Sequence, residues 1–254
     1  MRAKTCHILQ PGTRIRSRVL EPSISDATGL LAHRMKRIAV VSTVHEEKGL
    51  ANVPGLLAIL ERIKPELIFL EIPSAALDDY LTGSRSNLES AAVSRYRAEH
   101  VVDLVPVDLP TPEADFFTNN RDLFERIERT SPDYCRLVDW HSQYVRAHGF
   151  AYLNSEHCSD LFSQLRQATD SAIESLADQR LAELYDLWIR TNTLRDEAMI
   201  RNIENHCRQT SFSSAAFLVG AAHRQSILTL SRSEPGAAPS TVPWEFSGFL
   251  EEPH

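Results

Sequence analysis

The sequence predicts an α/β fold, in which helices flank a central, largely parallel sheet and a large helical insertion precedes the last core strand. The first observation is a set of short apolar segments, 37–44, 67–70 and 101–107, without the alternation of a half-exposed strand. Such runs are typical of parallel strands covered on both faces. The second observation is helical periodicity between these segments, which gives successive strand–helix–strand units.

The first unit consists of the strand 37–44, a helix over 52–63 and the strand 67–70. Lys64-Pro65 ends this helix just before the second strand. Helical periodicity returns over 75–81 and 87–99, and the strand 101–107 follows. The apolar face predicted for the first helix contains Val53, Leu56, Leu57, Leu60 and Ile63.

The segment 112–210 differs from the rest because it is long, polar and helical in period. We expect it to be an insertion that covers the carboxyl edge of the sheet, as a lid or as a plain helical subdomain. The apolar run before His223 then supplies another core strand. Of the tail, 231–240 is predicted to be a loop and 242–246 an edge strand that packs Trp244 and Phe246 against the sheet.

We expect two parts in the chain: a flexible extension over 1–34 and one α/β domain over 35–254. The extension has a local net charge of +4 and no sustained periodicity. Met35 is an alternative start of translation, since the first strong strand follows it directly.

Composition excludes several classes of protein. With 254 residues and 43% hydrophobic content, the chain is large enough for a full core. Its net charge of −7 argues against a nucleic-acid partner. No apolar stretch approaches the roughly 20 residues that span a bilayer, and we expect a cytoplasmic protein without a membrane partner. The four cysteines are widely spaced and predicted to be reduced thiols. The oligomeric state is not indicated.

Polar residues with acid/base or metal-binding chemistry follow four predicted strands: His45, Glu71, Asp108 and His223. In open parallel sheets, ligands bind just beyond the carboxyl ends of the strands. One site built from all four is therefore expected. The alternative is that each is an ordinary capping or solvated residue at a strand end.

A fifth candidate, Arg195, lies near the end of the insertion, on a helix whose buried stripe includes Met199 and Ile203. Its guanidinium could bind an anionic group or stabilise developing negative charge, and a surface salt bridge is the alternative. The sequence lacks the phosphate loop, the dinucleotide-binding glycine pattern and the serine nucleophile elbow, so the corresponding enzyme classes have no support.

The order of five segments resembles the TraB/PrgY/Tiki family, which belongs to a wider group with the erythromycin esterases and the ChaN-like haem-binding proteins. The resemblance covers roughly 36–230, and the second of the family's two Gly-x-x-His motifs is intact at 220–223. In the first motif, Ser42 stands where glycine is usual. The five segments are STVHEEKG, PELIFLEIP, VPVDLP, LRDEAMIRNI and FLVGAAHRQSI.

This resemblance implies a metal-dependent hydrolase that cleaves a peptide or ester bond in a peptide or small-molecule substrate. His45, Glu71 and His223 would bind a divalent cation, with manganese, cobalt and zinc all open. Glu71 would also be catalytic, Asp108 an accessory carboxylate and Arg195 an electrostatic stabiliser. The alternative is a non-enzymatic binding or signalling protein on the same fold, with a haem-like or peptide ligand.

Overall fold

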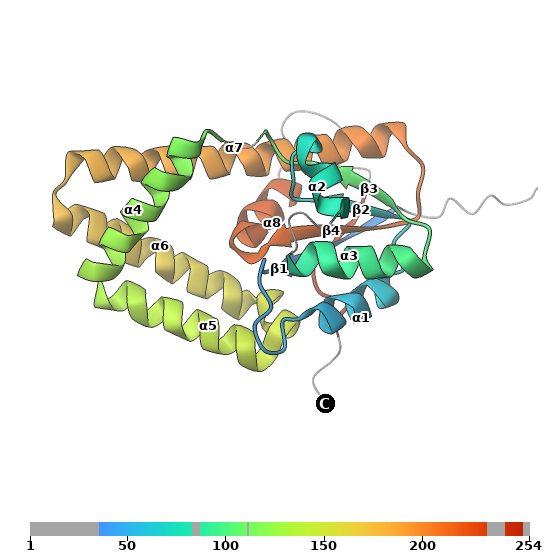
Figure 1. Ribbon diagram of the computed structural model, residues 1–254, viewed down its shortest axis with the longest axis horizontal. Coiled ribbons are helices and arrows are strands. Elements are labelled where there is room, and N and C mark those ends of the chain that lie inside the picture. Colours follow the sequence, from blue (N-terminus) through green and yellow to red (C-terminus); the bar gives the residue numbers. More distant parts are fainter. Residues whose placement is uncertain (1–35, 83–86, 111, 233–241, 251–254) are drawn as a thin grey trace, which may run out of the picture. The chain divides into compact units, whose positions relative to one another are not determined.

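A computed structural model of the protein describes residues 36–82, 87–110, 112–232 and 242–250 (Figure 1). The predicted extension 1–34 lies outside these residues, as does most of the predicted loop 231–240. Five parallel strands form one sheet, which confirms the predicted α/β class. The strands are β1 (Arg37–Thr43), β2 (Leu67–Leu70), β3 (Asp103–Pro106), β4 (Ser214–Gly220) and β5 (Trp244–Glu245).

The strands are not arranged in chain order, because β4 lies between β1 and β2 and the sheet reads β3-β2-β4-β1-β5. The pairing of β1 with β4 runs from Arg37 opposite Ser214 to Thr43 opposite Gly220. Residues that follow β1 and β4 in the sequence therefore emerge side by side at the carboxyl edge. The predicted edge strand is confirmed, since β5 pairs only with β1 in the described sheet.

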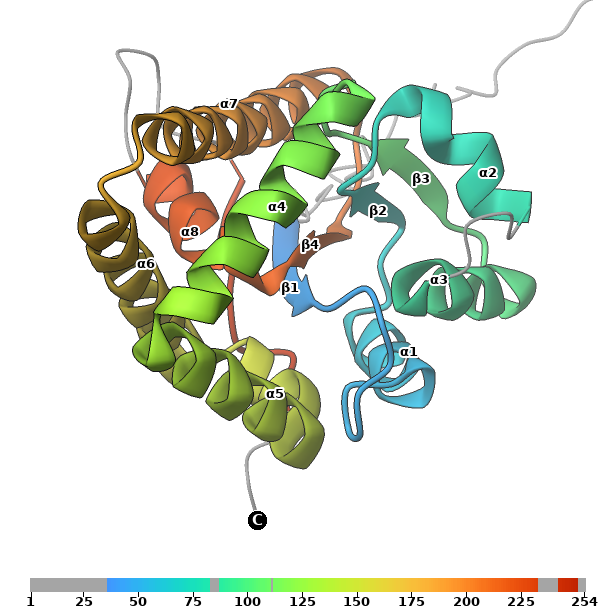
Figure 2. The ribbon, with the colours of Figure 1, turned by 60° about the vertical axis from the view of Figure 1, so that its left-hand side comes forward.

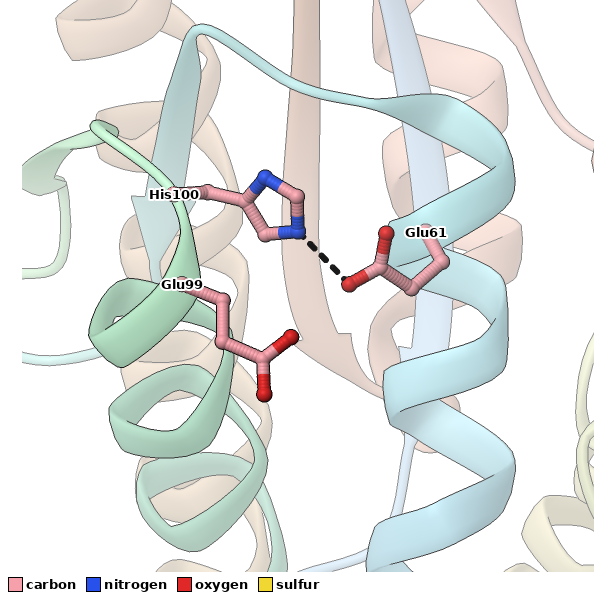
Figure 3. Close-up of side chains that lie close together, drawn as sticks. All are labelled: Glu61, Glu99 and His100. Atoms are coloured by element: carbon pink, nitrogen blue, oxygen red, sulfur yellow. Dashed lines mark hydrogen bonds and ion pairs between the residues drawn. The ribbon is translucent and has the colours of Figure 1, made fainter.

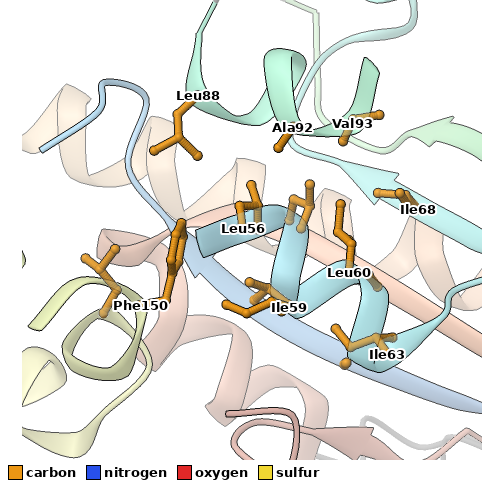
Figure 4. Packing of buried hydrophobic residues seen from close by; sticks show 14 of the residues in the cluster. Leu56, Ile59, Leu60, Ile63, Ile68, Leu88, Ala92, Val93 and Phe150 are labelled. Atoms are coloured by element: carbon orange, nitrogen blue, oxygen red, sulfur yellow. The ribbon is translucent and has the colours of Figure 1, made fainter. Parts of the chain in front are cut away.

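Two helices cover one face, α1 (Val53–Ile63) after β1 and α3 (Leu88–Glu99) after β2. Local signals define their ends. Asn52 caps α1 by accepting a hydrogen bond from the Gly55 amide. Asn87 and Ser90 form a reciprocal capping box at α3. The two helices pack through Leu56, Leu60 and Ala92 among others (Figure 4).

Alternate side chains of each central strand enter different cores. In β1, Ala39 and Val41 join the cluster beneath α1 and α3, whereas Ile38 and Val40 join a second cluster on the other face. The second cluster is covered by α8 (Arg224–Arg232) and by the last part of α7. Burial on both faces accounts for the continuous apolar runs in the sequence.

Four helices lie between β3 and β4. They are α4 (Ala114–Thr130), α5 (Pro132–Leu153), α6 (Glu156–Leu176) and α7 (Gln179–Gln209). Figures 1 and 2 show α4 packed across α5, α6 and α7. These helices have a small core of their own, to which Leu123 and Tyr185 belong.

The helix α7 connects this bundle to the sheet. It has 31 residues, or about 45 Å at 1.5 Å per residue. Tyr185 near its start lies in the core of the bundle, whereas Met199 and Ile203 lie against the sheet. The predicted buried stripe of Met199 and Ile203 is confirmed.

Two details of the first half differ from the prediction. The strand β3 has four residues instead of seven, because its partner β2 is equally short and Leu67 pairs with Asp103. Val101 precedes the ladder and is 99% exposed. In α1, Ile59 is buried and Leu57 is only partly buried, which rotates the apolar face slightly. Two short helical segments, η1 (Ser74–Ala76) and α2 (Leu77–Thr82), follow β2. Within the described residues, none of the helices is long and apolar enough to span a membrane.

Candidate functional site

The four strand-end candidates occur along the carboxyl edge in the order of the strands. Asp108 follows β3, Glu71 follows β2, His223 follows β4 and His45 follows β1, and these four strands are neighbours in that order. The side chains nevertheless form two groups. Asp108, Glu71 and His223 belong to one ionic cluster, and His45 contacts a different carboxylate.

Arg195 of α7 joins the ends of β2 and β3. Its Nη2 donates to Glu71 Oε1 and to Asp108 Oδ2, each at 2.7 Å, and its Nε donates to the other Asp108 oxygen, Oδ1, at 3.2 Å. The Asp108 carboxylate thus receives two parallel hydrogen bonds from one guanidinium, the strongest geometry for such a pair. The Arg195 side chain is 23% exposed, so solvent still reaches it.

His223 lies between two carboxylates. Its Nδ1 is 2.5 Å from Asp196 Oδ1, and its Nε2 is 3.2 Å from Glu71 Oε1. His223 is the last residue of η2 (Ala221–His223), which directly follows β4, and Asp196 lies on α7. The ring is mostly buried, so solvent screens these contacts little.

The charges of this pair stabilise each other. Burial alone would lower the pKa of His223, but the charge of Glu71 and the hydrogen bond with Asp196 raise it to about 10. Burial opposes ionisation of Glu71, yet the charge and hydrogen bond of His223 and the Gly220 amide lower its pKa to about 2. At neutral pH the pair is therefore an imidazolium and a carboxylate.

Gly220 shows why glycine begins the second Gly-x-x-His motif. Its amide donates to Glu71 Oε2 at 2.6 Å, and a Cβ at this position would lie 3.3 Å from the same oxygen. A side chain would crowd the carboxylate. Ser42, which stands in the first motif, is also buried. Its amide donates to the side-chain amide oxygen of Asn154, whereas the Gly220 amide donates to a carboxylate.

His45 pairs with Glu89, at the start of α3. The Nδ1 of His45 lies 3.2 Å from Glu89 Oε1, and the Thr43 hydroxyl donates to that oxygen at 2.8 Å. The hydrogen bond with Glu89 raises the pKa of His45, and burial opposes this rise. The His45 side chain is 68% exposed, whereas that of Glu89 is 9% exposed. One ring nitrogen is thus fixed by a buried carboxylate while the ring faces solvent.

Two buried polar atoms beside this pair have no hydrogen-bond partner among the described residues. They are Glu89 Oε2 and the hydroxyl of Tyr80. Burial and the charge of Glu89 both raise the pKa of Tyr80 strongly, so the hydroxyl stays protonated. Buried polar atoms are usually paired; two of the four unpaired buried side-chain atoms among the described residues lie at this corner of the site.

The loop after His45 is fixed by contacts with α3 and α5. The Leu88 amide donates to the His45 carbonyl at 2.9 Å, and the Leu50 amide donates to the Arg146 carbonyl at 3.1 Å. The approach to α5 requires glycine on both sides. Gly49 and Gly149 have φ values of +58° and +51°, and a Cβ on either would lie under 3 Å from the opposing backbone.

A pocket of about 530 Å³ opens beside Asp108. Its wall is made mainly of small and apolar residues from η1 and the turns at the ends of β2 and β3, together with Asp79. A substrate or ligand group can therefore reach the edge of the ionic cluster from this side. The lining residues are Pro73, Ser74, Ala75, Ala76, Asp79, Asp108 and Pro110.

The predicted metal ligands do not converge. Both nitrogens of His223 face carboxylates, both oxygens of Glu71 receive hydrogen bonds, and His45 faces Glu89. In the part of the chain that the structure describes, His45, Glu71 and His223 do not form a set with ligand atoms within 4.8 Å of one another. An imidazolium has no lone pair for a metal. The residues as arranged do not fit one cation bound by all three, and metal dependence stays a prediction.

Sequence reasoning missed two carboxylates of the site. Asp196 had a signal, because its spacing to Met199 and Ile203 puts a charged residue on the buried stripe of α7. It is 5% exposed. Glu89 had no comparable signal, since acidic residues are common in the first turn of a helix for electrostatic reasons. Its role depends on the approach of α3 to the end of β1.

Comparison with known proteins finds a remote structural likeness. The chain matches no protein-family model, and none of the curated proteins matches it. A solved structure of an erythromycin esterase mutant in its open conformation is similar over 73% of this chain, with 15% identity and a TM-score of 0.32. The match spans 60% of the length of that protein. The likeness is too remote to assign a substrate or a reaction.

Proposed function

We propose that the protein is a hydrolase of ester or peptide bonds in which His45 is the general base. The observation that carries this proposal is the His45–Glu89 pair, in which a buried carboxylate fixes one nitrogen of a solvent-facing imidazole. It lies at the carboxyl edge of a parallel sheet, where ligands bind. The resemblance to hydrolases in the order of the sequence motifs agrees with this proposal.

In the proposed reaction the Nδ1–H of neutral His45 donates to Glu89, which leaves a lone pair on Nε2. Nε2 takes a proton from a water molecule as the water oxygen bonds to the substrate carbonyl carbon. The charge on Glu89 stabilises the imidazolium that forms. The tetrahedral intermediate then collapses, and its leaving group takes the proton from His45.

The ionic cluster on the neighbouring strands would bind the substrate. Asp108, which lines the pocket, and Glu71 fix the guanidinium of Arg195, and its side chain remains partly exposed. A fixed cation near a developing oxyanion stabilises it without reorganisation. We assign Arg195 this role, and we assign Glu71 and Asp108 the positioning of Arg195.

A second candidate is a ligand-binding protein without catalysis. It is favoured by the internal pairing of the ionic cluster, since both oxygens of Glu71 and both nitrogens of His223 already have protein partners. Such a network can be purely structural. The pocket beside Asp108 would then be a binding site.

The test is turnover of p-nitrophenyl esters and of fluorescence-quenched peptides by the purified chain. His45→Gln and Glu89→Gln are compared with His148→Gln, an exposed histidine on α5. We expect His45→Gln to lower kcat/KM about 100-fold or more, and His148→Gln to leave it unchanged. Equal turnover in His45→Gln and wild type would refute the assignment. Absence of turnover, with ligand binding insensitive to His45→Gln, would favour the binding protein.

The same assay tests metal dependence. Activity is measured after chelation and after addition of manganese, cobalt or zinc. Loss on chelation with recovery by one ion would support the metal-dependent mechanism that the family resemblance implies. Activity that persists after chelation would favour water activation by His45 and Glu89 alone.

A further inference from the structure

A group of side chains with metal-binding chemistry lies at the amino edge of the sheet, opposite the candidate site. Glu61 is in the last turn of α1, Glu99 is the last residue of α3, and His100 follows it (Figure 3). These helices lead into the amino ends of β2 and β3. The group is therefore separate from the strand-end residues at the carboxyl edge.

The three side chains come from two helices that pack against each other. The Nε2 of His100 lies 2.7 Å from Glu61 Oε1, and one oxygen or nitrogen atom from each of the three residues lies within 4.8 Å of the others. Figure 3 shows the Glu99 carboxylate beside the Glu61–His100 pair. Small side-chain rotations would bring three ligand atoms onto one ion.

The imidazole is held in place by its neighbours. The rings of Tyr96 and His100 are stacked, with centroids 4.3 Å apart and planes 26° apart. Tyr96 is 2% exposed, so it gives the histidine a fixed support. Little conformational entropy is then lost when the imidazole binds a ligand.

The charge around this group favours a cation. Two carboxylates lie near the carboxyl ends of α1 and α3, where the helix dipoles add partial negative charge. No lysine or arginine forms an ion pair with Glu61 or Glu99 within the described residues. The nearby Arg62 donates instead to the Phe249 carbonyl, at 2.9 Å.

We propose that Glu61, Glu99 and His100 bind a divalent transition-metal ion that links α1 to α3. One imidazole nitrogen and two carboxylates suit zinc or cobalt, with water completing the coordination, and they suit magnesium less well. On binding, the proton that His100 Nε2 donates to Glu61 is lost to solvent or replaced by one on Nδ1, and the ion takes the freed Nε2 lone pair in place of that hydrogen bond.

The alternative is that Glu61 and His100 form a simple surface hydrogen bond in which Glu99 has no part. The two explanations differ at Glu99, which is exposed and whose side chain forms no hydrogen bond or ion pair with the other described residues. Glu99→Gln keeps the length of the side chain and removes its charge. It should therefore impair metal binding and leave metal-free stability unchanged.

The experiment uses the full chain after chelation, titrated with zinc chloride and followed by calorimetry and thermal unfolding. We expect one high-affinity ion and a rise in Tm of roughly 5 °C at about 100 times Kd. Glu99→Gln should weaken binding at least tenfold with an unchanged metal-free Tm, and His100→Gln should abolish the rise.

Two control variants locate the ion. His148→Gln should respond to zinc like wild type, and so should Glu71→Gln, which alters the other edge of the sheet. Equal zinc affinity in wild type and Glu99→Gln would overturn the proposal, as would a response lost in Glu71→Gln and kept in His100→Gln. Activity is not needed for this test, so its outcome is independent of the proposed hydrolysis.

Discussion

The side-chain amide of Asn154 pairs with the backbone of Ser42 as a neighbouring β-strand would. Its Oδ1 accepts from the Ser42 amide at 2.7 Å, and its Nδ2 donates to the Ser42 carbonyl at 3.1 Å. Asn154 lies in the turn between α5 and α6, and Ser42 is near the end of β1. One buried amide thus joins the helical insertion to the strand that leads into His45.

We predict that Asn154→Ala destabilises the fold by about 2–4 kcal/mol, because it leaves two buried backbone groups of Ser42 without a partner. The free energy of unfolding in urea measures this. Asn205→Ala is the control, since Asn205 is exposed on α7 and its removal should change stability by under about 0.5 kcal/mol. Similar losses in the two variants would show that the Asn154–Ser42 pairing contributes little.

The His223–Glu71 pair makes stability depend on pH in a defined direction. The pKa of His223 is about 10 in the folded protein and 6.5 as its ordinary value. The stability from the protonated ring is therefore fully present below pH 6.5 and is lost as pH rises toward 10. Glu71 has a lowered pKa of about 2, so its contribution is present above pH 4.5 and is lost as pH falls toward 2.

Urea midpoints between pH 6.5 and 10 test this for wild type and His223→Gln. We expect the wild-type midpoint to fall across this range, and the midpoint of the variant to fall much less. His148→Gln should retain the wild-type slope. A wild-type midpoint that stays flat or rises with pH would contradict the assigned charge of His223.

We predict that Gly149→Ala destabilises the protein by about 2 kcal/mol or more. The residue has φ +51°, and an added Cβ would lie 2.6 Å from the backbone of Leu50. The loop that begins at His45 would have to move. Thermal unfolding measures the loss, and the proposed esterase assay should show a lower kcat.

Ala147→Gly, two residues earlier on α5, is the matched control. It should cost only about 1 kcal/mol through helix propensity and should leave kcat unchanged. If Gly149→Ala were as stable as Ala147→Gly, the close approach of α5 to the loop would be unimportant for the fold.

The sequence predicted the carboxyl edge of the sheet better than the contacts made there. The apolar runs located β1 and β2, and the polar residue after each strand could be assigned to one edge. This works because parallel strands all present their carboxyl ends together. The strand order β3-β2-β4-β1-β5 could not be predicted from the sequence, because it depends on the position in the sheet that β4 takes after a long helical segment.

The partition of the site into two groups could not be predicted from local patterns either. His45 was expected to bind with Glu71 and His223, yet it contacts Glu89, which lies 44 residues away in the sequence. That contact depends on the packing of α3 against α1. The length of β3 was overestimated for a related reason. A strand cannot extend beyond the ladder of its partner, and β2 has only four residues.

The length of α7 gives the site a mechanical connection to the distant helices. Tyr185 anchors one end of α7 in the core of the helical bundle, and Arg195 and Asp196 contact the strand-end residues about 15 Å further along. A rotation of this rod by one residue would turn Asp196 by about 100° away from His223. The contact that helps to hold the proton on His223 is therefore made by the same helix that is anchored in the bundle, so the packing of α7 against α4 and α6 bears on the charge of His223 at the sheet.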